Sequence, residues 1–211
     1  MYVGLDLGSS GLRALLINED QHVLGSAQAH YEMLRPHPGW SEQRPSDWVE
    51  ATKAVFAELS AQFPKEMGAV RGIGISGQMH GATVLDAART VLRPCILWND
   101  TRSHVEAAAL DADPRFRALT GNIVFPGFTA PKLAWMRAHE PELFAQVDLV
   151  LLPKDYLRLW LTGEEAGDYS DAAGTSWLDG GSRSWSAELL SETGLNSDHM
   201  PRLVHGSDVS G

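Results

Sequence analysis

Residues 1–17 read MYVGLDLGSSGLRALLI, two short apolar runs on either side of a Gly-Ser-Ser-Gly turn. Runs of this length between turn-forming residues predict two antiparallel strands, Tyr2–Leu7 and Leu12–Ile17. A third apolar run, Val23–Ala29, extends the meander. The carboxylate of Asp6 lies near the end of the first strand, directly before the turn. We therefore expect the chain to begin as a sheet with a polar tip.

Further along the chain, helical and extended patterns alternate. Apolar residues recur at helical spacing from Ser46 to Phe63, where Ser46 can cap the helix and Pro64 is expected to end it. The other predicted elements are strands at Val70–Ser76, Thr83–Asp86 and Val91–Leu97, and helices near 102–112, 129–138 and 153–162. This alternation predicts an α/β layer architecture, in which ligands bind at loops beyond the strand ends.

Composition narrows the class of protein. The 211 residues are 44 % hydrophobic and 21 % charged, which suffices for a buried core. A formal net charge of −10 argues against nucleic acid and membrane surfaces as partners, because both require clustered Lys and Arg. No apolar run approaches the roughly 20 residues that span a bilayer. The opening residues lack a signal-peptide pattern, and the single cysteine, Cys95, excludes an internal disulfide, so we expect a cytoplasmic protein.

Asp6 and the turn after it form the first candidate site. A lone carboxylate is costly to bury, so Asp6 should face a cleft, a metal or a hydrogen-bond donor. The turn leaves backbone N–H groups open for phosphate oxygens, with the hydroxyls of Ser9 and Ser10 and the guanidinium of Arg13 nearby. A phosphate and Mg²⁺ site fits this pattern. A hairpin turn in which Asp6 caps its own backbone is the alternative.

The segment GISGQMHG, residues 74–81, places a second group of polar side chains after a strand. Its glycines allow close approach to a ligand, and the amide of Gln78 and the imidazole of His80 can each donate to and accept from hydroxyl groups. A sugar or polyol suits this chemistry. The alternative is a tight turn with a hydrogen-bonded His80 and with Met79 in the core. Metal binding is disfavoured, because the histidines are dispersed.

The segment LWNDTR, residues 97–102, is a third polar cluster. Trp98 offers a flat apolar face to a sugar, while Asn99, Asp100 and Arg102 could orient its hydroxyls. Alternatively, Asp100 or the threonine after it caps the following helix and Trp98 belongs to the core.

Later segments are harder to assign. The helix start at residues 128–135 has a core role, and Lys154 is expected to be a solvated charge. In DYSDAAGT, residues 168–175, two carboxylates and three hydroxyls lie among small residues. Asp171 in this segment could contact a ligand, or the segment could be a capped turn.

In their order along the chain, these segments resemble the FGGY carbohydrate kinases, and within them the bacterial xylulose kinases. The resemblance covers essentially the whole chain and rests on MYVGLDLGSSGLRALL, RPHPGWSEQ, GISGQMHGATVLD, RPCILWNDTRS, TGNIVFPGFTAPKLAW, LLPKDYLRLWLTGE and SDAAGTSWLD. It implies an actin-like ATPase, ribonuclease-H-like lobe: an α/β fold with a mixed sheet flanked by helices and a helical insertion. It also implies ATP, Mg²⁺ and transfer of the γ-phosphoryl group to the 5-hydroxyl of D-xylulose.

The resemblance also implies roles for individual residues. Asp6 matches the catalytic aspartate near Mg²⁺ and the phosphates. The cofactor-binding positions are Gly8, Ser9, Ser10 and Arg13. The substrate-binding positions are Met79 and His80, with Gln78, Trp98, Asn99 and Asp171 as pocket neighbours. The corresponding loop of glycerol kinases carries a different polar pair, which is why the Gln-Met-His sequence favours xylulose.

The resemblance implies that residues 1–211 are the N-terminal, sugar-binding lobe of a two-lobed kinase. We expect its core over about residues 1–100, a helical insertion over about 101–165 and a return to the core over 166–211. A homodimer is compatible with this reading. A kinase for ribulose, glycerol or a sugar acid, and a non-catalytic sugar-binding module, remain alternatives.

The general base of the family, in a Gly-Gly-Asp-type segment, and most of the adenine site are expected in a C-terminal lobe beyond Gly211. Residues 204–211 read as a strand or loop cut in mid-course. We therefore expect the 211 residues alone to be inactive.

Overall fold

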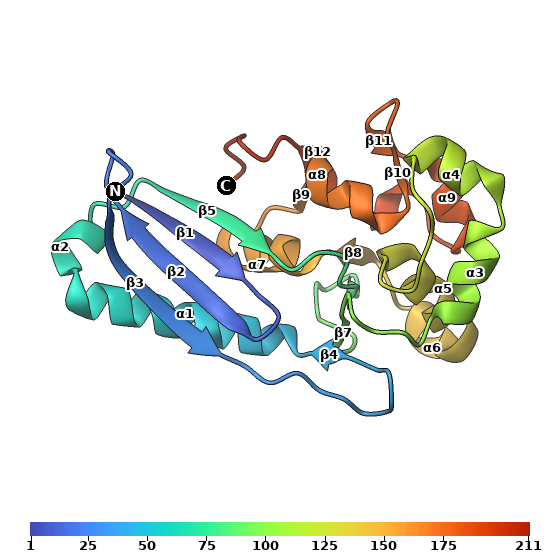
Figure 1. Cartoon of the computed structure of the whole chain (residues 1–211), viewed down its shortest axis with the longest axis horizontal. Helices are drawn as coiled ribbons and strands as arrows, with labels where there is room; N and C mark the ends of the chain where they lie inside the picture. Colours follow the sequence, from blue (N-terminus) through green and yellow to red (C-terminus); the bar gives the residue numbers. More distant parts are fainter.

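A four-stranded mixed sheet forms one end of the molecule (Figure 1). Its strands are β1 (Tyr2–Leu7), β2 (Gly11–Ile17), β3 (Val23–His30) and β5 (Gly72–Gly77). In the order β3-β2-β1-β5, the first three are antiparallel neighbours, whereas β5 runs parallel to β1. The computed structural model describes all of residues 1–211, and it confirms the predicted meander.

The two faces of this sheet differ because side chains alternate along each strand. Leu5 and Leu12 are buried, whereas Asp6 and Arg13 are exposed. The helix α1 (Pro45–Gln62) packs against the buried face, next to β2 and β3. The acidic and basic side chains near the turn therefore lie on the face that α1 leaves open.

The ends of α1 differ from the prediction. The helix begins at Pro45, and the residue before it, Arg44, makes no side-chain cap. Proline fixes its φ near the helical value and needs no hydrogen-bond partner for its nitrogen, so it suits the first helical position, and the expected Ser46 cap was wrong. Pro64 does follow the end of α1, but it also begins a second short helix, α2 (Pro64–Met67).

The remaining strands are short and pair two by two. They are β4 (Glu42–Gln43) with β7 (Cys95–Ile96), β6 (Thr83–Leu85) with β8 (Leu149–Leu151), β9 (Ala166–Asp168) with β12 (Arg202–Val204), and β10 (Leu178–Asp179) with β11 (Ser184–Trp185). The long strand predicted over Val91–Leu97 is thus only the two residues of β7.

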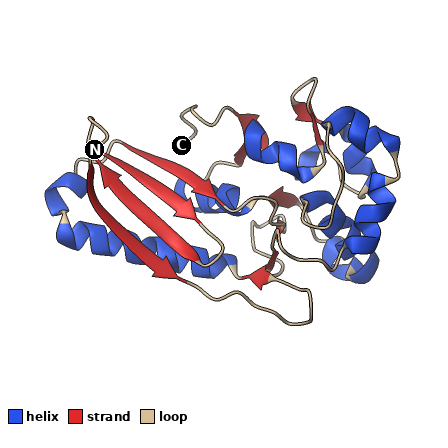
Figure 2. Cartoon of the chain, in the orientation of Figure 1, coloured by secondary structure: helices blue, strands red, loops and turns tan.

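Helices gather at the end opposite to the main sheet (Figure 2). They are α3 (His104–Asp111), α4 (Pro114–Thr120), α5 (Thr129–His139), α6 (Pro141–Phe144) and α9 (Ala187–Glu192). The helix α7 (Pro153–Thr162) packs beside α1 and β5, and the remaining helical segments are α8 (Tyr169–Ala172) and the 3₁₀ turns Ala173–Thr175 and Ser197–His199. None of the helices has the length and apolarity to cross a membrane.

Two large hydrophobic cores follow from this arrangement, besides a small cluster of Leu85, Leu149 and Leu151. One joins the sheet to α1 and includes Trp48 and Leu59, both fully buried. The other lies among the helices and includes Phe116, Leu133 and Trp177. Complete burial of such side chains stabilises the fold by about 1.5–3 kcal/mol each. The division of the chain near residues 100 and 165 stays a prediction.

Candidate active site

Asp6 stands on the open face of the sheet, one residue before the end of β1. The hydroxyl of Ser76, its neighbour on β5, donates to Asp6 Oδ1 at 3.3 Å. Arg13 is its neighbour on β2, yet it forms no ion pair within 4.0 Å. Both charges are therefore available to a ligand.

The Gly-Ser-Ser-Gly turn is held at one end and open at its tip. The N–H of Gly8 donates to the carbonyl of Gly11 at 3.0 Å, and the hydroxyl of Tyr31 donates to the carbonyl of Gly8. The backbone N–H groups of Ser9 and Ser10, in contrast, donate to no protein acceptor. Two free backbone donors suit phosphate oxygens, and an exposed carboxylate suits Mg²⁺, so these residues fit the expected ligands.

A buried glutamine connects this turn to the Gln-Met-His loop. Gln43, fully buried, donates from Nε2 to the carbonyl of Ser9 at 2.6 Å. Its Oε1 accepts hydrogen bonds from Gln78 Nε2 at 2.8 Å and from Trp48 Nε1 at 3.1 Å. The N–H of Gln78 also donates to the carbonyl of Leu7, the last residue of β1. Gln78 thus lies behind the loop, with its own Oε1 buried and unpartnered.

His80 occupies the centre of the loop. Its φ is +64°, a left-handed conformation that is uncommon for residues other than glycine. Its carbonyl accepts from Thr129 Oγ1 at 3.2 Å and from Lys132 Nζ at 2.7 Å, and its ring packs edge-on to Phe128 with centroids 4.7 Å apart. Burial, helped by the charge of Lys132, lowers the pKa of His80 to about 4. The imidazole is therefore neutral at physiological pH.

Three predicted sugar-binding residues line one pocket of about 380 Å³. They are Met79, His80 and Asp171, which share the pocket with Ile75, Ser76, Gly77, Lys154, Asp168, Ser170 and Gly174. Since Ser76 also contacts Asp6, this pocket adjoins the end of β1 that leads into the Gly-Ser-Ser-Gly turn. The core position proposed for Met79 was wrong, because the residue is 46 % exposed. Gln78, Trp98 and Asn99 do not line the pocket.

Lys154 is surrounded by carboxylates at the wall of this pocket. Its Nζ lies 2.6 Å from Asp155 Oδ1, 2.8 Å from Asp168 Oδ2 and 3.0 Å from Asp171 Oδ2. Burial raises the pKa of Asp155 to about 6 and also raises that of Asp171, while Lys154 opposes both shifts. The expectation of a solvated Lys154 was wrong, since the lysine compensates three partly or fully buried acids.

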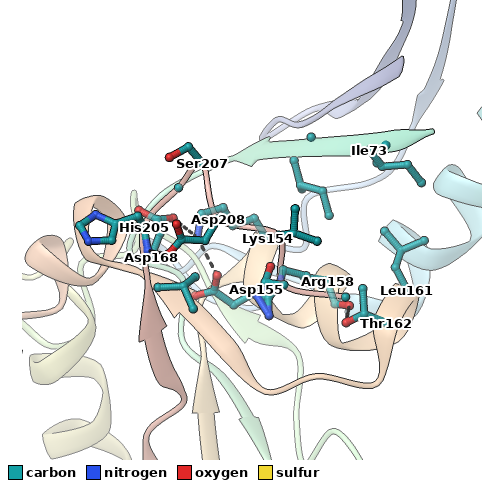
Figure 3. A pocket seen from close by; sticks show the side chains of 18 of the residues that line it. Ile73, Lys154, Asp155, Arg158, Leu161, Thr162, Asp168, His205, Ser207 and Asp208 are labelled. Atoms are coloured by element: carbon teal, nitrogen blue, oxygen red, sulfur yellow. Dashed lines mark hydrogen bonds and ion pairs between the residues drawn. The ribbon is translucent and has the colours of Figure 1, made fainter. Parts of the chain in front are cut away.

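A larger pocket of about 630 Å³ lies on the other side of Lys154 (Figure 3). It is bounded by β5, by α7 and by residues 204–211. Figure 3 shows Lys154, Asp155 and Asp168 gathered at one end of it. Because Lys154 and Asp168 line both pockets, the charged cluster is their common wall.

The segment of Asp168 and Asp171 was predicted either to contact a ligand or to form a capped turn, and the structure is compatible with both. Asp168 caps α8, accepting from the N–H groups of Ser170 and Asp171. The side chain of Asp171 nevertheless faces the pocket. A capped turn therefore presents a carboxylate to the site.

The LWNDTR segment divides into a buried part and an exposed part. Arg102 forms a two-point ion pair with Asp100 at 2.9 and 2.7 Å, reaches Glu42 at 2.7 Å and lies 3.6 Å over the ring of Trp40. Because Asp100 and Arg102 are at least 93 % buried, they cannot orient a sugar, and this expectation was wrong. The expected cap was also wrong, because α3 follows Ser103 and has no side-chain cap.

Trp98 lies beside the Gly-Ser-Ser-Gly turn, and Asn99 lies beside Met33. Trp98 is 41 % exposed, so the core alternative is wrong, and its Nε1 donates to Ser9 Oγ at 2.9 Å. Asn99 directs its amide nitrogen toward Met33 Sδ at 3.7 Å, and its Oδ1 is buried without a partner. The tryptophan therefore helps to fix the turn that carries the free N–H groups.

Residues 1–211 match the N-terminal domain of the FGGY family of carbohydrate kinases. The chain belongs to this family. Its relatives include the xylulose kinases of Escherichia coli (strain K12), 51 % identical, and Klebsiella pneumoniae, 53 % identical. Both alignments cover 100 % of the chain but only 43 % and 44 % of the relatives. The chain thus spans less than half the length of these curated relatives.

Solved structures agree with this assignment. A crystal structure described as a xyloylose kinase from Brucella ovis superposes with a TM-score of 0.98 at 63 % identity, covering 100 % of the FGGY chain and 44 % of the other. The family resemblance and the actin-like, mixed α/β lobe expected from the sequence are therefore confirmed.

The sequence alone assigned no role to Gln43 or Ser76 and predicted only a solvated charge at Lys154. The contacts of all three residues follow from the fold. One signal was available: the lysine and aspartate at 154 and 155 interrupt an otherwise apolar run, LLPKDYL, and charges in such a place are buried only when paired.

Proposed function

We propose that residues 1–211 are the sugar-binding N-terminal lobe of an ATP-dependent kinase that phosphorylates D-xylulose at its 5-hydroxyl. One observation carries this proposal. Ser76 lines the pocket of Met79, His80 and Asp171 and also donates to Asp6 beside the phosphate turn. A sugar in the pocket and phosphates at the turn would therefore be neighbours.

The pocket has the chemistry to recognise a small polyhydroxy ligand. The neutral imidazole of His80 can donate from one nitrogen and accept at the other. Asp171 supplies acceptors and Met79 an apolar contact for the carbon face of the sugar. A volume of about 380 Å³ is within the range of small-ligand pockets.

The turn supplies the phosphate side of the site. Ser9 and Ser10 would donate their free backbone N–H groups to phosphate oxygens, with Gly8 allowing close approach and Arg13 adding positive charge. Asp6 would hold Mg²⁺, which when bound neutralises phosphate charge. These residues position and stabilise the nucleotide's phosphates, and they form no covalent bond to it.

Phosphoryl transfer would then need one further group. The 5-hydroxyl oxygen forms a bond to the γ-phosphorus, the bond from that phosphorus to the β–γ bridging oxygen breaks, and the hydroxyl proton passes to a base. From the family resemblance we place this base, with most of the adenine site, in the second lobe. Residues 1–211 alone are accordingly inactive in this proposal.

The experiment is an ADP-release assay on a full-length kinase that carries residues 1–211 as its N-terminal lobe. We expect D-xylulose to give the highest kcat/KM in a panel with ribulose, glycerol, gluconate and D-fructose. The variant Asp6→Asn should lower kcat by at least about a hundredfold, as expected for loss of a phosphate-neutralising group. A preference for another member of the panel would reassign the substrate, and sugar binding without turnover would favour a non-catalytic module.

We also place the kinase in the cytoplasm. Cys95 is fully buried as a free thiol, which suits a reducing compartment. Assembly into a homodimer stays a prediction that light scattering of the full-length kinase would test.

A further inference from the structure

Lys132 is a fully buried lysine, and nothing in the neighbouring sequence predicts its burial. Its side chain, on α5, is fully inaccessible, and no carboxylate lies within 4.0 Å of its Nζ. Burial lowers its pKa to about 7. An unpaired amine is costly to remove from water, so its place in the interior calls for specific partners.

Those partners are two backbone carbonyls on two different loops. Lys132 Nζ donates to the carbonyl of His80 at 2.7 Å and to that of Gly127 at 2.8 Å. Gly127 directly precedes Phe128, whose ring packs against the imidazole of His80. The two acceptors therefore belong to the loop that carries His80 and to the loop that covers its ring. Even a neutral amine has two N–H donors, which match the two carbonyls.

A second donor from the same helix reinforces this contact. Thr129, in the first turn of α5, donates from Oγ1 to the carbonyl of His80 at 3.2 Å. The carbonyl belongs to a residue with a left-handed φ, which costs free energy unless the surroundings hold it. Neither Lys132 nor Thr129 lines the pocket.

We propose that Lys132, assisted by Thr129, is a positioning residue for sugar recognition: by anchoring the His80 carbonyl to α5 and to the Phe128 loop, it holds the imidazole in the pocket. The inference deepens the proposed function and rests on it. Lys132 does not touch the sugar or the phosphates; its effect passes through the backbone of residue 80.

The test compares Lys132→Met, which keeps the length and apolar body of the side chain but removes its donors, with Met136→Ala one turn later on α5. Met136 is fully buried and lies outside the pocket, so its truncation lowers stability without releasing His80. In the full-length kinase we expect Lys132→Met to weaken D-xylulose binding, measured by calorimetry, by roughly tenfold, the equivalent of about 1.4 kcal/mol of lost hydrogen bonding. The KM for ATP should stay unchanged, and Met136→Ala should bind the sugar like the wild type.

The His80 imidazole signals in ¹H–¹⁵N spectra provide a readout that does not depend on the sugar. They should shift in Lys132→Met and stay in place in Met136→Ala. Wild-type protein that binds no D-xylulose would refute the proposed function. The spectra would still show whether Lys132 holds the His80 ring in place. If Lys132→Met binds the sugar as tightly as the wild type and its spectra are unchanged, the positioning role of Lys132 is wrong. The proposed function would not be affected.

If Lys132→Met does not fold, Thr129→Val makes the same test, because it removes the other side-chain donor to the His80 carbonyl. Binding weakened by roughly threefold, with shifted His80 signals, supports the anchor. Wild-type binding and spectra in Thr129→Val overturn it.

Discussion

Gln43 joins the two halves of the candidate site, because its amide donates to the carbonyl of Ser9 at 2.6 Å while its Oε1 accepts from the loop of His80 through Gln78. The turn proposed for phosphate and the loop proposed for sugar are thus fixed to each other by one buried side chain.

Gln43→Leu should destabilise the lobe. The change leaves the buried donors of Trp48 and Gln78 without their acceptor, and a buried unsatisfied group costs about 1–3 kcal/mol. We expect the free energy of unfolding, from urea denaturation, to fall by about 2–4 kcal/mol. The matched control is Gln62→Leu on the exposed side of α1, which should stay within about 0.5 kcal/mol of the wild type. Equal effects of the two changes would contradict a connecting role for Gln43.

The imidazole of His80 should titrate near pH 4 rather than near the ordinary 6.5. Because its pKa is lower in the folded state, the unfolded chain binds more protons between pH 4 and 6.5, and stability rises with pH across this window. His80→Asn should therefore flatten the dependence of stability on pH between about 4 and 6.5. NMR titration of the ring checks the value directly, and a midpoint near 6.5 would show that the imidazole is not desolvated.

Gly174→Ala should weaken sugar binding. A Cβ at this position would lie 2.2 Å from Cε1 of His80, so the ring or the backbone must move. We expect at least about tenfold weaker D-xylulose binding, since a misplaced imidazole loses its hydrogen bonds to the ligand. Gly180→Ala is the control, because its Cβ meets nothing closer than 3.7 Å. Unchanged affinity in Gly174→Ala would place the sugar away from His80.

Lys154→Met should remove the cation that pairs directly with Asp155, Asp168 and Asp171. Asp155 is 4 % exposed, and breaking a buried ion pair by deleting one partner costs about 3–5 kcal/mol. A loss of about 3 kcal/mol in unfolding free energy is expected at pH 7, with recovery on acidification as the carboxylates take up protons. Lys53→Met removes an exposed ion pair with Glu50 and should change stability by less than about 0.5 kcal/mol. A similar small effect at Lys154 would show that water, not the lysine, solvates the acids.

Local patterns predicted the antiparallel meander and the long helices, because alternation in β1 and helical spacing in α1 both reflect burial in the core that these two elements share. They could not predict short pairs such as β6 with β8. These strands have three residues each and are brought together by packing between distant segments.

The same limit applies to the site. Asp6 and His80 carry recognisable chemistry in motifs, whereas the burial of Asp100 and Arg102 depends on Glu42 and Trp40 from elsewhere in the chain. A polar residue in a motif can support the fold or contact a ligand, and only its partners in three dimensions distinguish the two roles.

A crystal structure of the full-length kinase with D-xylulose bound tests the central claim most directly. We predict the sugar between Met79, His80 and Asp171, with its 5-hydroxyl toward the side of the pocket where Ser76 meets Asp6. A sugar bound outside this pocket, or one whose 5-hydroxyl faces away from Asp6, would contradict the account.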